Sequence, residues 1–420
     1  MNLIILGLIS AVSAAPSLAD ETQSRCDNMM VWDVPMQMCM PLPMPGPPPM
    51  KMTMAMIHGN AFGARIWEEG PRGRDAYAAP NMVMADIGTS LGDRHYLNLD
   101  FMGTAEKWTF PEAGYPLLLQ IGEHNEEGVP FIDAQHPHSS PIMGLTLSDT
   151  IKLDTGDKDN LKLSFAPRGE STDGPIAFMH RPTGMANPDA PLGHHIGQDV
   201  GHISSTVLAS SLRLGATIIE ASAFNGTEPE PTKVDLPIGT PNSYAVRLIR
   251  EFTPTVTAMA SAAYVREPEH DDPSLPFVAR FSASVYTENA LNENWSLYNS
   301  LIFGNIRKLD HVESLSSFAE EFWIEGDRPR VFGRLEVLQR TAEQLAISED
   351  NSPTWVVAAT LGYSHALWKA SGENGDFGEL ALGGSVTKDF LPAAFEGAYG
   401  GDPWTGKVFL QLKGMKMWDL

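Results

Sequence analysis

The sequence is poor in positive charge and in long apolar runs. Its 420 residues include 29 Lys and Arg against 52 Asp and Glu, which gives a net charge of −23. Nucleic acid and anionic lipid headgroups are bound by cationic surfaces, so we expect neither as a partner. No window of about 18 apolar residues is free of charge, which argues against a membrane-spanning helix.

Several motifs of enzymes and cofactor proteins are also missing. The chain has no HExxH, no Cys-x-x-Cys and no Cys-x-x-Cys-His. The absence of the last motif excludes an ordinary covalent c-type haem site. We therefore expect a protein that is not an enzyme, and a His-ligated copper metalloenzyme is the lowest-ranked alternative.

Only two cysteines are present, Cys26 and Cys39, and both lie near the N-terminus. Outside the cytoplasm such a pair usually oxidises. A bond that closes so short a loop typically contributes roughly 3 kcal/mol by constraining the unfolded chain. The pattern favours a Cys26–Cys39 disulfide, and a copper thiolate at Cys39 is the alternative.

The N-terminus has the features of a secretory signal peptide. An apolar stretch from Leu3 to Val12 precedes small residues and Ser17-Leu18-Ala19, a small-x-small cleavage site. We assign residues 1–19 to the signal peptide, 20–60 to a Met/Pro-rich N-terminal segment and 61–420 to the folded domain.

Methionine is concentrated in the N-terminal segment, where ten of the twenty lie between Met29 and Met56. Met-x-Met recurs there, and prolines prevent residues 41–49 from forming a helix or a central strand. Thioether and thiolate sulfur are soft ligands that select Cu(I). A flexible linker or plug is the alternative, because Met packs well against irregular surfaces. The expected ligands are Met36, Met38, Cys39, Met40, Met44, Met50, Met52, Met54 and Met56.

From about residue 82 onward, apolar residues alternate with polar ones, as Leu97, Leu99 and Phe101 do. About fourteen such segments follow, with another near 404–413, and many have the nine to eleven residues of a tilted transmembrane strand. The pattern predicts an all-β, antiparallel transmembrane β-barrel of about 14–16 strands. A secreted β-sandwich or jelly roll is the competing interpretation. Aromatic residues expected at the membrane interfaces are Tyr264, Tyr286, Trp295, Trp323 and Trp355.

Two long regions, residues 104–142 and 166–202, interrupt this pattern and hold seven of the twelve histidines. Loops of this length are usually functional or disordered. Imidazole suits copper, zinc, iron and nickel, and the alternative is that these side chains stabilise the loops by hydrogen bonding. The expected metal ligands are His136, His138, His180, His194, His195 and His202.

Several stretches together resemble a family of outer-membrane β-barrel proteins of Gram-negative bacteria associated with copper handling. They include Val31-Trp32-Asp33, Met36-Gln37-Met38-Cys39-Met40-Pro41, His58-Gly59-Asn60-Ala61-Phe62, Gly114-Tyr115-Pro116-Leu117-Leu118-Leu119-Gln120, Gln135-His136-Pro137-His138, Phe178-Met179-His180-Arg181-Pro182, Gly193-His194-His195 and Glu220-Ala221-Ser222-Ala223-Phe224-Asn225-Gly226. The chain departs from the expected pattern at Ser139 and Thr227. The resemblance implies an outer-membrane location and a copper context.

Together these features predict an outer-membrane barrel involved in copper binding, transport or resistance, with a Met/Cys-rich Cu(I)-binding segment in the periplasm or the lumen. The expected partners are outer-membrane lipid, copper ions and periplasmic copper proteins. The alternative is a general cation-selective porin, or a structural barrel without metal, with a Met-Pro plug.

Overall fold

The computed structural model describes residues 53–420, except residues 126, 139–140, 156–158, 230, 232, 235, 237, 269–275, 309–313 and 373–375. It also describes the backbone of two short strands, β1 (Met30–Asp33) and β2 (Met38–Pro41). These two strands pair antiparallel, with Trp32 opposite Cys39.

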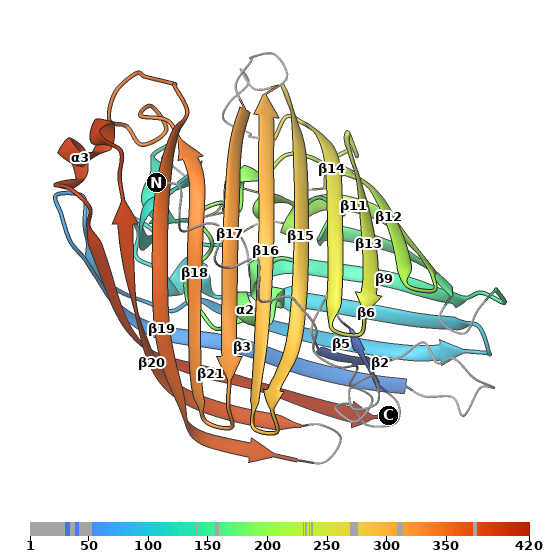
Figure 1. Cartoon of the computed structure of the whole chain (residues 1–420). Coiled ribbons are helices and arrows are strands. Elements are labelled where there is room, and N and C mark those ends of the chain that lie inside the picture. The colour runs from blue at the N-terminus through green and yellow to red at the C-terminus, as the bar shows by residue number, and fades with distance from the viewer. Residues whose placement is uncertain are drawn as a thin grey trace.

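Sixteen antiparallel strands form one closed barrel (Figure 1). The barrel closes where β21, the last strand, pairs with β3, the first. A further short strand, β4 (Asp75–Ala78), extends the sheet beside the second half of β3. The sixteen strands are β3 (Thr53–Glu68), β5 (Asn81–Leu91), β6 (His95–Gly103), β9 (Ile142–Lys152), β10 (Asn160–Gly169), β11 (Ser204–Leu214), β12 (Thr217–Asn225), β13 (Ser243–Thr253), β14 (Val256–Arg266), β15 (Phe277–Asn292), β16 (Trp295–Lys308), β17 (Ser314–Glu325), β18 (Pro329–Arg340), β19 (Thr354–Ser371), β20 (Phe377–Phe390) and β21 (Trp404–Asp419).

The predicted fold class, an antiparallel β-barrel, is confirmed, and the strand count lies at the upper end of the predicted range. One of the sixteen barrel strands was not predicted, and neither were the short strand β4 and the hairpin of β7 (Tyr115–His124) and β8 (Pro130–Gln135). β3 begins at Thr53, inside the segment assigned to the N-terminal extension. Its outer face carries Ala55 and Ile57 and its inner face carries Met54 and Met56, so the sequence here shows no alternation of polar and apolar residues.

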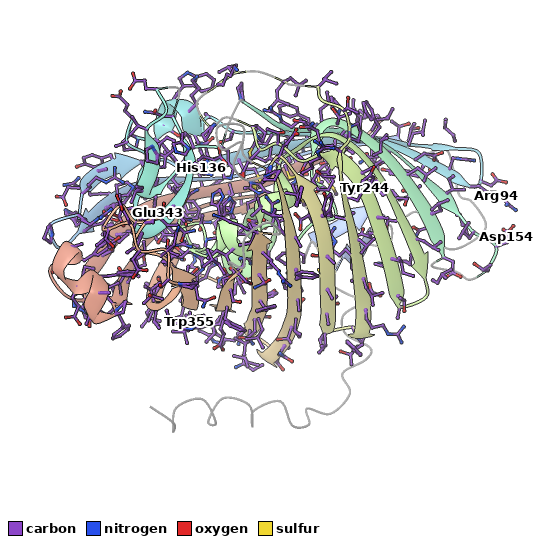
Figure 2. All side chains as sticks on the ribbon, turned by 90° about the horizontal axis from the view of Figure 1, so that it is seen from above. Arg94, His136, Asp154, Tyr244, Glu343 and Trp355 are labelled. Atoms are coloured by element: carbon purple, nitrogen blue, oxygen red, sulfur yellow. The ribbon has the colours of Figure 1, made fainter. Side chains whose placement is uncertain are left out.

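The barrel is polar inside and apolar outside. In β18, Leu335 on the outer face is 43% exposed, while its neighbours Arg334 and Glu336 are each 4% exposed in the lumen. Soluble proteins have the opposite arrangement, whereas a barrel surrounded by hydrocarbon needs this one. Side chains project both ways from the ring of strands, and Trp355 is among those on the outside (Figure 2).

Four of the five predicted aromatic positions divide into two sets, and the fifth, Trp295 at the start of β16, is half-buried. Tyr264 and Trp355 are exposed near the ends of their strands, as expected for residues at a membrane interface. Tyr286 and Trp323 are buried, so their assignment to that interface is wrong. Period-two patterning separates the two faces of a strand, but it does not by itself show which face an aromatic side chain occupies.

The two ends of the barrel differ in their connections. At one end the strands are joined by short turns, as between β13 and β14 or β15 and β16, and β3 begins and β21 ends there. The opposite end carries the long connections, including both histidine-bearing insertions. In bacterial outer-membrane barrels the short turns face the periplasm and the long loops face outward.

The first insertion contains α1 (Glu106–Thr109) and a hairpin of β7 (Tyr115–His124) with β8 (Pro130–Gln135). The second contains short helical turns: η3 (Phe178–His180), α2 (Pro182–Met185), η4 (His194–Gln198) and η5 (Val200–His202). Another short helix, α3 (Ala393–Tyr399), precedes β21. No helix in the described part of the chain is long and apolar enough to cross a membrane.

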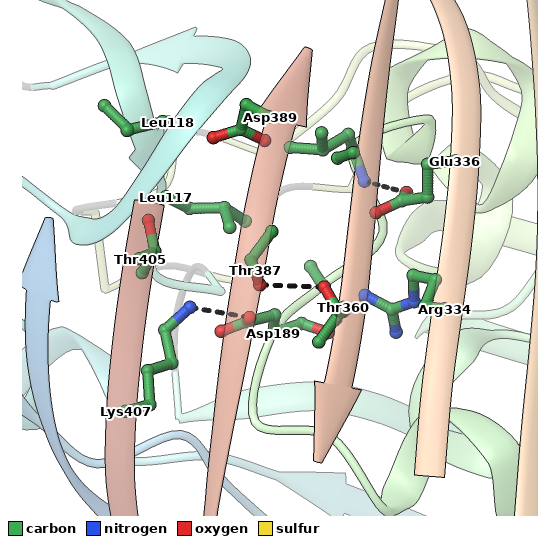
Figure 3. Close-up of a pocket in the computed structure, with 13 residues that line it drawn as sticks. Leu117, Leu118, Asp189, Arg334, Glu336, Thr360, Thr387, Asp389, Thr405 and Lys407 are labelled. Carbon is green, nitrogen blue, oxygen red and sulfur yellow. Dashed lines mark hydrogen bonds and ion pairs between the residues drawn. The ribbon is translucent and has the colours of Figure 1, made fainter. Parts of the chain in front are cut away.

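Both insertions fold back into the lumen and bind the barrel wall. Arg340 of β18 donates hydrogen bonds to the carbonyl oxygens of Leu119, at 2.9 Å, and Leu192, at 2.6 Å, so that one side chain holds both insertions. Lys407 of β21 pairs with Asp189 at 2.6 Å. Beside Asp189 and Lys407, the cavity between the barrel wall and the insertions has a volume of about 10 Å³ (Figure 3). This is room for about one water molecule.

Candidate metal centre

Five histidines of the two insertions meet inside the barrel, and we call this group the histidine centre. His136 and His138 follow β8 in the first insertion, while His194, His195 and His202 come from η4 and η5 in the second. Centroids of neighbouring rings lie between 4.6 Å, for His194 and His195, and 6.3 Å, for His136 and His138. Residues distant in sequence are thereby brought together by the inward folding of both insertions.

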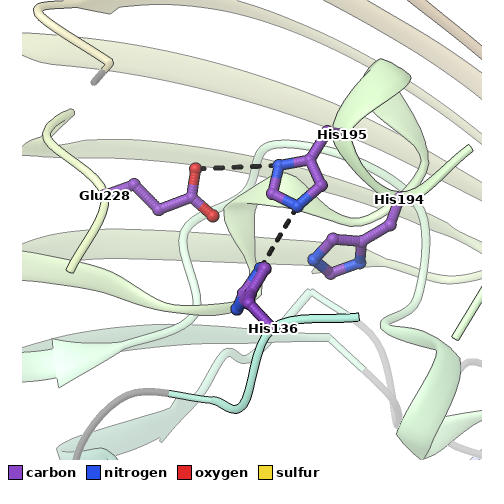
Figure 4. A group of neighbouring side chains, drawn as sticks. All are labelled: His136, His194, His195 and Glu228. Carbon is purple, nitrogen blue, oxygen red and sulfur yellow. Dashed lines mark hydrogen bonds and ion pairs between the residues drawn. The ribbon is translucent and has the colours of Figure 1, made fainter. Parts of the chain in front are cut away.

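Within the centre, two overlapping groups have the geometry of a metal site. His136, His194, His195 and Glu228 each offer one ligand atom within 4.8 Å of the others (Figure 4). His194 also belongs to a second group, with Asp199 and His202. Glu228 is supplied by the connection that follows β12 (Thr217–Asn225).

The closest contact in the first group joins the Nε2 atoms of His136 and His195, at 3.2 Å. Two nitrogens bound to one tetrahedral ion at about 2.0–2.1 Å would lie about 3.3 Å apart. The two imidazoles therefore already have nearly the separation that a shared metal ion requires. Without an ion, one of the two nitrogens must carry a proton and donate it to the other.

Three of the imidazoles are held by hydrogen bonds from Nδ1. His136 donates to the Pro137 carbonyl at 3.0 Å, and His202 donates to the Asp199 carbonyl at 2.5 Å. His138 donates to the Glu106 carboxylate at 2.5 Å. In His136 and His202 this bond fixes the tautomer and leaves Nε2 as the ligand atom, which is the usual outer-shell arrangement around metal-bound histidine. His138 belongs to neither ligand group.

Two buried nitrogens of the centre lack a hydrogen-bond partner among the described residues: His194 Nδ1 and His202 Nε2. The nearest carboxylate oxygen to His194 Nδ1, from Asp199, is 3.6 Å away, beyond normal hydrogen-bonding distance. Most buried polar atoms have such a partner, because an unpaired one costs free energy. A metal ion would complete the bonding of both nitrogens.

Burial largely determines the charge of these side chains. Loss of water lowers the pKa of His136 and His195 well below the usual value and the pKa of His202 to about 3. Burial alone would also lower the pKa of His138, but the Glu106 carboxylate raises it above the usual value. His136, His195 and His202 are therefore neutral near pH 7, and neutral imidazole is the form that binds metal ions.

Gly122 of β7 provides the space that His195 occupies. A Cβ atom at this position would lie 2.2 Å from His195 Nε2, and the backbone has a φ of +142°. We expect Gly122→Ala to displace His195 and to weaken Cu(II) binding about 10- to 100-fold, as other changes around metal ligands do. Competition with a chelator of known affinity measures this effect.

Gly128→Ala is the matched control for that change. Gly128 also has positive φ, at +76°, and lies between β7 and β8, but a Cβ atom there meets nothing within 4 Å. Equal loss of Cu(II) affinity in both variants would show that backbone strain, and not contact with His195, is responsible.

The structure brings together five of the six predicted histidines. The sixth, His180, lies outside both metal-ligand groups, and so does His138, which joins the centre through ring contacts with His136 and His202. Met54 and Met56 lie in β3, where they pack with Met417 in the lumen. The side chains of the seven other predicted ligands lie outside the described residues: Met36, Met38, Cys39, Met40, Met44, Met50 and Met52. The same holds for both partners of the predicted disulfide, Cys26 and Cys39.

Three carboxylates of the site were not assigned to it from the sequence: Glu106, Asp199 and Glu228. Asp199 lies between His195 and His202, so its proximity to the histidine run was a usable signal. Glu106 and Glu228 are distant in sequence from the histidines they contact, and no local pattern distinguishes them from the many other acidic residues.

Comparisons with known proteins identify the fold. No family model and no curated protein matches the chain. Among solved structures, OmpF of Salmonella typhi is 8% identical, with a TM-score of 0.52, and the alignment covers 86% of this chain and 97% of that one. The anion-selective porin from Comamonas acidovorans is 12% identical, with a TM-score of 0.49 and coverage of 87% and 99%. The chain therefore has a porin-like barrel fold.

Proposed function

We propose that this chain is an outer-membrane barrel that binds copper within its lumen and serves copper transport or resistance. The histidine centre carries the proposal, because five imidazoles, two of them with unpaired buried nitrogens, converge at one place. The apolar outer face and the porin-like fold support the membrane location. Imidazole and carboxylate ligands suit Cu(II) as well as other divalent ions.

Copper titration of the metal-free, full-length protein in detergent tests this function. We expect about one tightly held Cu(II) per chain, whose electron paramagnetic resonance spectrum shows coupling to imidazole nitrogen. His124→Ala should leave this signal unchanged, because His124 lies in the same insertion but outside both ligand groups. Copper that shows no nitrogen coupling and exchanges freely with a weak chelator would contradict the proposal.

Binding of Cu(I) by the N-terminal Met/Cys segment is a second part of the proposal. Its support is the sequence, in which soft sulfur ligands recur between residues 29 and 52. Because β3 begins at Thr53, deletion of residues 29–52 leaves the barrel strands intact. We expect the shortened protein to bind fewer Cu(I) ions in competition with a Cu(I) chelator, and equal binding would contradict this part.

The porin-like fold favours a general cation-selective porin as the second candidate. That function requires a water-filled passage, whereas both insertions pack against the lumen wall in the described residues. We therefore expect the protein to conduct little ion current in planar lipid bilayers. Steady conductance of the size of an open porin would favour the second candidate over metal binding.

A further inference from the structure

Methionine is unevenly distributed over the barrel. Elsewhere the lumen wall is rich in Ser, Thr, Arg and Glu, but along five adjacent strands it also carries eight methionines. Among the described barrel strands, Met259 of β14 is the one methionine that lies outside this sector. The others are Met54, Met56, Met82, Met84, Met102, Met143, Met415 and Met417, on β3, β5, β6, β9 and β21.

Four soft side chains of this sector form one row across neighbouring strands. Met415 of β21 is directly opposite His58 of β3, which is opposite Met84 of β5, and Met84 is opposite Met102 of β6. Directly opposed residues point to the same face, with Cβ atoms about 4.5–5.5 Å apart. We call Met415, His58, Met84 and Met102 the thioether row.

One of the two ring nitrogens of His58 has no partner among the described residues. His58 Nε2 is buried and has no hydrogen-bond partner among the described residues. In the next row toward the short-turn end, Asp86 and Asp100 stand directly opposite each other. One carboxyl oxygen of Asp86 is also buried with no hydrogen-bond partner among the described residues. A bound cation would give the imidazole nitrogen a partner, with two carboxyl groups in the neighbouring row.

The row lies between the short-turn end and the histidine centre. Toward the turns, Met54, Met56 and Met417 pack together with Met415. Toward the insertions, Met84 and Met102 pack in a cluster that includes Phe178. The Phe178 ring is 6.2 Å from the ring of His138 and 6.2 Å from that of His194. Soft or aromatic side chains therefore continue from one end of the barrel to the histidine centre.

We infer that the thioether row is a second metal site, selective for Cu(I) or another soft monovalent cation, through which the histidine centre exchanges metal with the short-turn end of the barrel. The ion passes as Cu(I), which imidazole also binds, so its oxidation state does not change, and Cu(II) serves only as the spectroscopic probe of the histidine centre. Thioether sulfur with one imidazole is a soft ligand set that disfavours hard cations. Weak thioether ligands also suit transfer, because an ion that passes on must be released. The inference rests on the proposed function, since the histidine centre is the destination.

Nuclear magnetic resonance of the full-length protein with 13C-labelled methionine methyl groups tests the row directly. Ag(I) is the probe, because it is a soft cation that does not change oxidation state under these conditions. We expect the signals of Met84, Met102 and Met415 to shift with Ag(I), whereas the signal of Met259 stays in place. Immobile signals of the three row methionines, while other methionines respond, would overturn the inference.

Leucine substitutions separate ligation from packing, since Met and Leu have similar volumes and exchange at small cost. Met84→Leu, Met102→Leu and Met415→Leu together should lower Ag(I) affinity at the row at least tenfold, and Met259→Leu should not. Unchanged affinity in the triple variant would also overturn the inference. The Cu(II) spectrum reports on the histidine centre separately from the row. Nitrogen coupling in that spectrum without a shift of the methionine signals rejects the row alone. Shifted methionine signals without nitrogen coupling reject the histidine centre alone.

Discussion

Replacing Glu321 with Ala is expected to destabilise the barrel by about 3–5 kcal/mol, the usual cost of removing one partner of a buried ion pair. Glu321 of β17 is fully buried and lies between two arginines. Its carboxylate accepts hydrogen bonds from Arg181 at 2.7 and 2.9 Å and from Arg334 at 2.9 Å. Thr183 donates to the same carboxylate at 2.8 Å.

The size of this effect follows from what remains after the substitution. Arg181, from the second insertion, and Arg334, from the wall, are both buried and would face each other without a shared counter-charge. The carboxylate is also the point at which the second insertion is fixed to the wall. Denaturant unfolding, followed by tryptophan fluorescence in detergent or lipid, measures the change in stability.

Asp327→Ala is the matched control, because Asp327 lies in the turn that follows the same strand and is 80% exposed. Its removal should hardly change the unfolding midpoint. A triple variant, Arg181→Met with Glu321→Leu and Arg334→Met, should recover part of the lost stability, because apolar groups can replace a buried charged triad. An unfolding curve of Glu321→Ala that matches the wild-type curve would contradict the assigned role of the carboxylate.

The second large effect is expected at the histidine centre, where His194→Ala should weaken Cu(II) binding by more than about 100-fold. His194 is the one residue common to both ligand groups, so its loss leaves neither group complete. Changes of outer-shell partners alone typically cost 10- to 100-fold in metal affinity, and the loss of a ligand exceeds this range. Competition with chelators of graded affinity gives the value.

His124→Ala again serves as the control, and circular dichroism shows whether either variant still folds. A folded His194→Ala protein with wild-type Cu(II) affinity would mean that the centre is a packed group of histidines and not a metal site. Loss of the imidazole coupling in His194→Ala, with retention in His124→Ala, is the expected pair of results.

The barrel strands were largely predictable because each one faces two different environments. β18 illustrates this, since Arg334 and Glu336 alternate with Val337 and Leu335 along one strand, and the predicted range 329–339 is close to the observed Pro329–Arg340. β3 was missed because its lumen face carries Met54, Met56 and His58 in place of the usual polar residues. A period-two signal depends on contrast between faces, and here both faces are mostly apolar.

The histidine centre was predictable as a set of residues but not as an arrangement. The long insertions and their histidine content indicated all six histidines, of which His136, His194, His195 and His202 belong to the ligand groups, while His138 and His180 do not. Convergence inside the lumen depends on long-range contacts, such as the hydrogen bonds from Arg340 to both insertions. No short sequence window records such contacts, and the same is true of Glu106 and Glu228.

The pairing of β3 with β21 gives the thioether row a place in the order of assembly. His58 belongs to the first strand of the barrel and Met415 to the last, so the two become neighbours only when the ends of the sheet meet. Contacts between such distant parts of a chain are entropically expensive and form late in folding. The row is therefore complete only in a finished barrel, because a nascent, still open sheet has Met415 at one free edge and the other three residues of the row at the opposite edge.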